Sequence, residues 1–138
     1  MQLVADVNVV FSALVSKGVP FKVFKENSLA GKYEFASPAF LLSEMEDNWS
    51  RLLSSTKLTK EELEEIMSAI KEQVTFIPFS DFSDKLPEAM ELNFKDSPYL
   101  ALALKFDCAI FSGDKGLKKQ SKVKVFSPRE LLDMLGTN

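Results

Sequence analysis

The chain has 138 residues, a formal net charge of −3, and 46% hydrophobic against 27% charged residues, so we expect one soluble domain over residues 1–138 with a sizeable core. It contains no histidine, which excludes Ser-His-Asp and Cys-His catalysis and histidine-ligated zinc, and its one cysteine excludes an internal disulfide. Any hydrolysis would therefore depend on carboxylates, metal ions, lysine or hydroxyl groups.

Strands and helices are expected to alternate along the chain. In chain order we expect a strand at 2–5, helices at 8–15 and 21–29, a strand at 33–36, helices at 38–53 and from 60, a strand at 74–78, an irregular stretch at 79–95 with a helical turn at 87–92, a helix at 96–105, strands at 109–112 and 123–126, and a helix from 128. This order predicts an α/β fold of three layers, α/β/α, around a central, mostly parallel sheet of about five strands. The last strand is short and half polar, as is typical of a sheet edge.

Local patterns mark where several helices begin and end. Thr59 and Ser127 each stand three residues before a glutamate, which is the spacing of a capping box. Ser37 before Pro38 also predicts a helix start, with serine as the N-cap and proline at the first helical position. Gly31 is expected to end the second helix.

Three aspartates stand where predicted strands end or a helix begins. Asp6 follows the first strand, Asp114 follows the strand at 109–112, and Asp96 opens an apolar helix. Each of them alone is also an ordinary turn or cap residue. If the strands are parallel, however, all three aspartates fall at the carboxyl edge of the sheet, where α/β proteins gather their functional groups.

Glu44 adds a fourth acid to this group. It falls on the apolar stripe of the helix at 38–53, and we expect it to point inward. A buried carboxylate costs several kcal/mol unless it is paired or bound to metal; a position at the boundary of the stripe is the alternative. Clustered carboxylates repel one another, and oxygen ligands select Mg²⁺ or Mn²⁺. Asn8 and Ser112 are candidates to support the site.

The order of these motifs resembles the PIN-domain ribonucleases, in particular the prokaryotic VapC-like toxins. The residues from Asp6 to Asn8 resemble their opening Asp-Thr-Asn motif, and Glu44 resembles their helix-borne acid. Asp96 before an alanine-rich helix, and the segment 112–114, resemble the third and fourth motifs. The terminal segment 127–132 is similar to the Pro-Arg-Glu helix of the prokaryotic branch.

This chain also departs from the pattern of that family. Val7 stands where a threonine is usual, and it removes a hydroxyl that can support the first aspartate. Gly116 stands where many relatives carry a further acid. The acidic cluster before Asp96 is reduced, with Lys95 adjacent to it. The last two departures lower the negative charge of the expected site.

The resemblance implies a metal-dependent endoribonuclease with a PIN-like fold, often the toxin of a type II toxin–antitoxin pair. Asp6, Asp96 and Asp114 would hold Mg²⁺ or Mn²⁺, with Glu44 acting directly or through water, and all four acids would be catalytic. The implied partners are RNA, an antitoxin protein and a second copy of the chain. Cleavage would leave a 5′-phosphate and a 3′-hydroxyl, because no histidine is present to activate a ribose 2′-hydroxyl.

A run of lysines begins beside Asp114 and gives the chain its one locally basic stretch. Lys115, Lys118 and Lys119 are candidates to bind an RNA phosphate. Lysines that protect an exposed sheet edge are an equally good interpretation.

Two other functions and the location of the protein complete the expectations. A PIN-like module that binds RNA or protein without efficient cleavage is the main alternative. A receiver-like phosphoacceptor domain is less favoured, because no aspartate follows the strand at 74–78 until Asp81.

No apolar run approaches the roughly 20 residues of a membrane span. The N-terminus lacks a signal-peptide pattern, so we expect a cytoplasmic protein without membrane contact.

Overall fold

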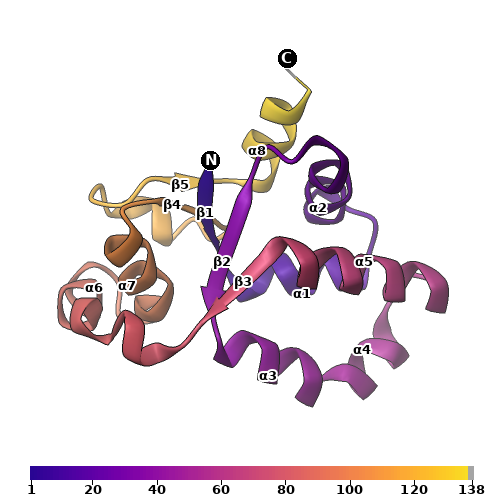
Figure 1. The fold of residues 1–138 in the computed structure, drawn as a ribbon, viewed down its shortest axis with the longest axis horizontal. Helices are drawn as coiled ribbons and strands as arrows, with labels where there is room; N and C mark the ends of the chain where they lie inside the picture. Colours follow the sequence, from indigo (N-terminus) through magenta and orange to yellow (C-terminus); the bar gives the residue numbers. More distant parts are fainter. Residues whose placement is uncertain (137–138) are drawn as a thin grey trace.

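Five parallel strands form the centre of the structure, in the order β3-β2-β1-β4-β5 (Figure 1). This computed structural model describes residues 1–136. Each pair of neighbouring strands runs parallel, which confirms the predicted fold class and places β5 at an edge. The strands are β1 (Gln2–Ala5), β2 (Glu34–Pro38), β3 (Val74–Ile77), β4 (Ala109–Phe111) and β5 (Val125–Phe126).

Helices connect the strands and cover both faces of the sheet (Figure 1). They are α1 (Val7–Val15), α2 (Val19–Ala30), α3 (Phe40–Asp47), α4 (Trp49–Ser55), α5 (Lys60–Gln73), α6 (Leu86–Leu92), α7 (Ser97–Phe106) and α8 (Pro128–Leu135). Short 3₁₀ turns lie at Phe79–Asp81, Ser83–Lys85 and Leu117–Lys119. The stretch expected to be irregular thus contains two such turns and α6, which agrees with the helical turn predicted at its end.

The sheet separates two hydrophobic clusters, because alternate side chains of a strand point to opposite faces. In β1, Leu3 and Ala5 join the cluster that also contains side chains of α1, α2, α5 and α8, whereas Val4 joins the cluster formed with α6 and α7. Three aromatic rings meet in the larger cluster. The ring centroids of Phe24, Phe35 and Phe111 lie 5.1–5.7 Å apart, an arrangement worth about 0.5–1.5 kcal/mol per pair beyond burial.

Most of the predicted helix boundaries are confirmed. The capping boxes at Thr59 and Ser127 both form, with each hydroxyl accepting from the glutamate N–H and each glutamate accepting from the cap N–H. Gly31 ends α2 in the left-handed conformation, at φ 61°. The four side chains that fall on one face of α5 by spacing are all buried: Leu63, Ile66, Met67 and Ile70.

The helix predicted from Pro38 to about Leu53 is wrong at its start and in its continuity. Ser37 and Pro38 are the last residues of β2, where Pro38 pairs with Ile77, and the Ser37 hydroxyl donates to the Ala5 carbonyl at 2.7 Å. Pairing of Ser37 and Pro38 with β3 requires extended backbone here and overrides the local Ser-Pro pattern. The helix then breaks at Asn48, which has φ −101° and ψ 9° and divides it into α3 and α4.

Among residues 1–136, no single helix is both long and apolar enough to cross a membrane. α1 and α2 reach that length and composition only when taken together, across a bend of 93°. Both helices contribute buried side chains to the larger hydrophobic cluster, among them Val10 and Phe24.

Candidate metal centre

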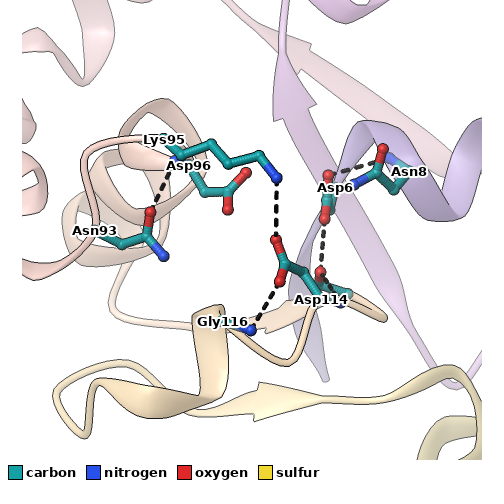
Figure 2. A network of polar contacts seen from close by, with 8 residues as sticks. Asp6, Asn8, Asn93, Lys95, Asp96, Asp114 and Gly116 are labelled. Carbon is teal, nitrogen blue, oxygen red and sulfur yellow. Dashed lines mark hydrogen bonds and ion pairs between the residues drawn. The ribbon is translucent and has the colours of Figure 1, made fainter.

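Asp6, Asp96 and Asp114 come together beyond the carboxyl ends of β1 and β4 (Figure 2). The strand register explains the approach of two of them: Ala5 pairs with Phe111, so the chain leaves both strands at the same height, next to each other. Asp96 is the residue that directly precedes α7, and α7 packs against this part of the sheet. The three aspartates that were expected at one sheet edge therefore lie near one another at that edge.

Asp6 is held by donors on both carboxylate oxygens. It is fully buried at the N-cap of α1, where the Asn8 backbone N–H donates to Oδ1 at 3.1 Å. The Ser112 hydroxyl donates to Oδ2 at 2.6 Å. A helix N-terminus favours negative charge, and each carboxylate oxygen keeps a free lone pair. Ser112 thus supplies a hydroxyl to Asp6 in a chain that has Val7 in place of threonine, while Asn8 acts through its backbone.

Ser112 also fixes the loop that carries Asp114. Its Oγ accepts from the Asp114 backbone N–H at 3.0 Å, so a single hydroxyl bridges the two acidic residues. The Gly116 N–H donates to Asp114 Oδ1 at 2.7 Å. A Cβ at position 116 would lie 3.1 Å from that oxygen, which is a tight contact. Glycine therefore lets the loop close on the Asp114 carboxylate, and a further acid at 116 would crowd it.

Asp96 has the least satisfied carboxylate of the three. It occupies the N-cap position of α7 but makes no side-chain cap hydrogen bond, so the alternative of an ordinary cap residue does not explain its side chain. The residue is 6% exposed, and its Oδ2 is buried without a hydrogen-bond partner among residues 1–136. Burial raises the pKa of Asp96 to about 6, and the adjacent Asp114 carboxyl and the charge of Asp6 act in the same direction. An orphaned buried oxygen beside two more carboxylates fits a hard divalent cation.

Glu44 does not point inward as predicted. It is exposed on α3, whose buried residues are Leu41 and Met45. Glu44 is one residue, or about 100° of helix, from Met45, which places it at the boundary of the apolar stripe, the alternative given for it in the sequence. Glu44 still lies within electrostatic reach of the site. The pKa of Tyr99 is raised first by burial, then by the charge of Asp6 and then by that of Glu44.

One cation already lies among these acids. The ammonium Nζ of Lys95 lies 3.9 Å from Asp114 Oδ2 (Figure 2). Within residues 1–136, no group of three or more acidic or cysteine side chains is arranged so that it could hold a metal ion without rearrangement. In the sequence, Lys95 stands out only for its charge next to Asp96. Its contact with Asp114, which lies far along the chain, has no signal in the sequence.

The lysines predicted to bind RNA differ in their surroundings. Lys118 pairs with Glu130 at 2.6 Å, and this contact, together with the hydrogen bonds between Glu130 and Ser127, lowers the pKa of Glu130 to about 2. Lys115 and Lys119 are exposed. Farther along the run, Lys122 pairs with Glu88 at 2.7 Å. Part of the basic stretch is therefore neutralised locally, which leaves Lys115 and Lys119 as the freer candidates for a phosphate contact.

Comparison with known proteins gives two matches. A sequence model described as "PIN domain" matches residues 4–130. Among solved structures, the crystal structure of VapBC2 from Rickettsia felis bound to a DNA fragment from their promoter is similar, with a TM-score of 0.61 and 14% sequence identity. The alignment covers 92% of this chain and 98% of that chain, and at this identity it shows likeness of fold. No curated protein matches the chain in sequence.

Proposed function

Since the chain belongs to the PIN-domain family, we propose that it is a metal-dependent endoribonuclease. Asp6, Asp96 and Asp114 would hold Mg²⁺ or Mn²⁺ at the carboxyl edge of the sheet. The observation that carries the proposal is the Asp96 carboxylate, which is buried with one oxygen unpartnered among residues 1–136 and has two acidic residues beside it. A divalent cation would supply the positively charged partner that this buried carboxylate lacks.

The residues of this chain divide the work of the site between them. When bound, the divalent ion supplies Lewis acidity and positive charge for the scissile phosphate. Ser112 fixes Asp6 and the Asp114 backbone relative to each other, and Gly116 orients the Asp114 carboxylate. Asn93 accepts from the Asp96 N–H at 3.1 Å and holds the turn from which Asp96 extends. With no histidine in the chain, cleavage is expected to leave a 5′-phosphate.

A toxin role with an antitoxin partner is the finer part of the proposal. Its support is the fold shared with VapBC2, which was crystallised with a promoter DNA fragment. The chain also has a hollow between α3, α4 and α5, where Met45, Trp49 and Met67 lie beside the polar side chains of Glu46, Glu64, Ser68 and Lys71. A homodimer and RNA contacts through Lys115 and Lys119 belong to the same proposal.

A non-cleaving PIN-like module is the second candidate. It is favoured by the absence, within residues 1–136, of three acids already placed to ligate an ion. It is also favoured by a lysine ammonium among the aspartates. This candidate predicts RNA or protein binding without turnover.

Cleavage of a labelled RNA with Mn²⁺ or Mg²⁺ separates the two candidates. We expect the wild-type protein to cut in the presence of metal and to stop when EDTA is added. The Asp6→Asn and Asp114→Asn variants should lose roughly 100-fold or more of the rate, because each removes several kcal/mol of metal-dependent stabilisation. Glu26→Gln, an exposed acid on α2, is the control. Cleavage that survives in both aspartate variants would reject the metal site, and binding without any cleavage would favour the second candidate.

A further inference from the structure

We propose that Lys95 is the built-in counter-ion of the aspartate site: its ammonium offsets part of the negative charge of the acids when no metal is bound and competes with the divalent ion that enters. This inference rests on the proposed metal site and concerns how that site is loaded. A lysine in this place would set the divalent-ion concentration at which the protein becomes loaded. It would be a positioning residue that acts through the charge of the cluster.

The first support is the geometry of the Lys95 side chain. Lys95 directly precedes Asp96 in the chain. Its side chain extends across the site, so that its ammonium reaches Asp114 on the opposite side (Figure 2). Lys95 Nζ lies 3.9 Å from Asp114 Oδ2, and Lys95 also lowers the pKa of Asp96. Among residues 1–136, no other lysine or arginine forms an ion pair with Asp6, Asp96 or Asp114.

The second support is the turn that aims this side chain. The Asp96 N–H donates to Asn93 Oδ1 at 3.1 Å, and the Ser97 N–H donates to the Phe94 carbonyl at 3.4 Å. These bonds fix the backbone on both sides of Lys95. The same turn therefore positions both Lys95 and Asp96 at the site.

The third support is the exposure of the two partners. The Lys95 side chain is 80% exposed and the Asp114 side chain 21% exposed. An ion pair this open to water is weak, so a divalent ion can displace the ammonium without breaking buried structure. The Asp6 and Asp114 carboxylates are held by hydrogen bonds from Asn8, Ser112 and Gly116, whereas the exposed lysine can turn into solvent. A tight, buried lysine would block the site, but an exposed one only raises the metal concentration needed.

The affinity for Mn²⁺ alone tests this proposal, measured by calorimetry or electron paramagnetic resonance without RNA. Lys95→Ala should bind Mn²⁺ about three- to tenfold more tightly than the wild type, as expected for removal of one partly screened positive charge. Lys95→Arg should keep the wild-type affinity. Lys22→Ala, an exposed lysine on α2, removes the same charge away from the site and should change nothing. The gain in Lys95→Ala should shrink as salt is raised, since screening weakens the lost repulsion.

The outcomes separate this inference from the proposed function. If the wild type binds Mn²⁺ and Lys95→Ala binds it with the same affinity, Lys95 is no competitor, and the inference is overturned while the metal site stands. If Lys95→Arg behaves like Lys95→Ala, the effect is not one of charge, which also overturns it. If neither wild type nor Lys95→Ala binds Mn²⁺ at millimolar concentration, the proposed metal site itself is wrong.

Discussion

The Asp96→Asn substitution should make the metal-free protein more stable at neutral pH. Asp96 is buried beside two other acids, with an oxygen that has no partner among residues 1–136. Its pKa is raised from the ordinary 3.8 to about 6 in the folded protein. The folded state therefore binds this proton more tightly than the unfolded chain does. Its contribution to stability is fully present below about pH 4 and is lost as the pH rises through about 6.

The size of the effect follows from that difference in pKa. Moving from 3.8 to about 6 corresponds to about 3 kcal/mol at most. Solvent that reaches the site reduces this, so we expect about 1–2 kcal/mol at pH 7.5. Asparagine has nearly the same shape and carries no charge. The variant should match the wild type near pH 4 and exceed it increasingly up to neutral pH.

Guanidinium unfolding in EDTA at pH 4, 5, 6 and 7.5 measures this difference. Glu26→Gln on α2 is the control for loss of one negative charge, and its effect should not grow with pH in this way. A variant that is less stable than wild type at pH 7.5 would refute the reasoning. A stability difference that does not depend on pH would also refute it, because the cost would then not come from ionisation of Asp96.

Two further substitutions test how the site and the fold are built. Ser112→Ala should cost about 1–3 kcal/mol in guanidinium unfolding, because it removes the buried hydroxyl that joins Asp6 to the Asp114 backbone; a loss below about 0.5 kcal/mol would show that this bridge is dispensable. Gly31→Ala should lower the free energy of unfolding by about 1 kcal/mol, because φ is 61° there. An alanine Cβ at this position would meet no atom of residues 1–136 within 4 Å, so backbone strain alone sets that cost. Unchanged stability in the alanine variant would mean that α2 can end in another conformation.

The fold was predictable because its signals are local and agree with one another. Thr59 and Ser127 show their capping boxes in the sequence, and the alternation of elements predicts a parallel sheet. Once the sheet is parallel, Asp6 and Asp114 must share an edge if their strands are neighbours, which the register of β1 and β4 shows. Ser37 was misassigned because its strand pairing depends on residues far along the chain.

The surroundings of the site were less predictable than its three aspartates. Glu44 was expected to face inward, but it is exposed, because it lies one residue, or about 100° of helix, from the buried Met45 and so falls at the boundary of the apolar stripe. The contact of Lys95 with Asp114 depends on a turn and on a side-chain direction. Neither of these leaves a periodic signal in the sequence.

A crystal of this protein soaked with Mn²⁺ and examined by anomalous scattering tests the central claim most directly. We predict one strong peak between Asp6, Asp96 and Asp114, with carboxylate oxygens at roughly 2.0–2.3 Å from the ion. The Asp96 Oδ2 atom, which is unpartnered within residues 1–136, should be among the ligands. A saturating soak that leaves this place without a peak, or that places the ion on other residues, would contradict the account.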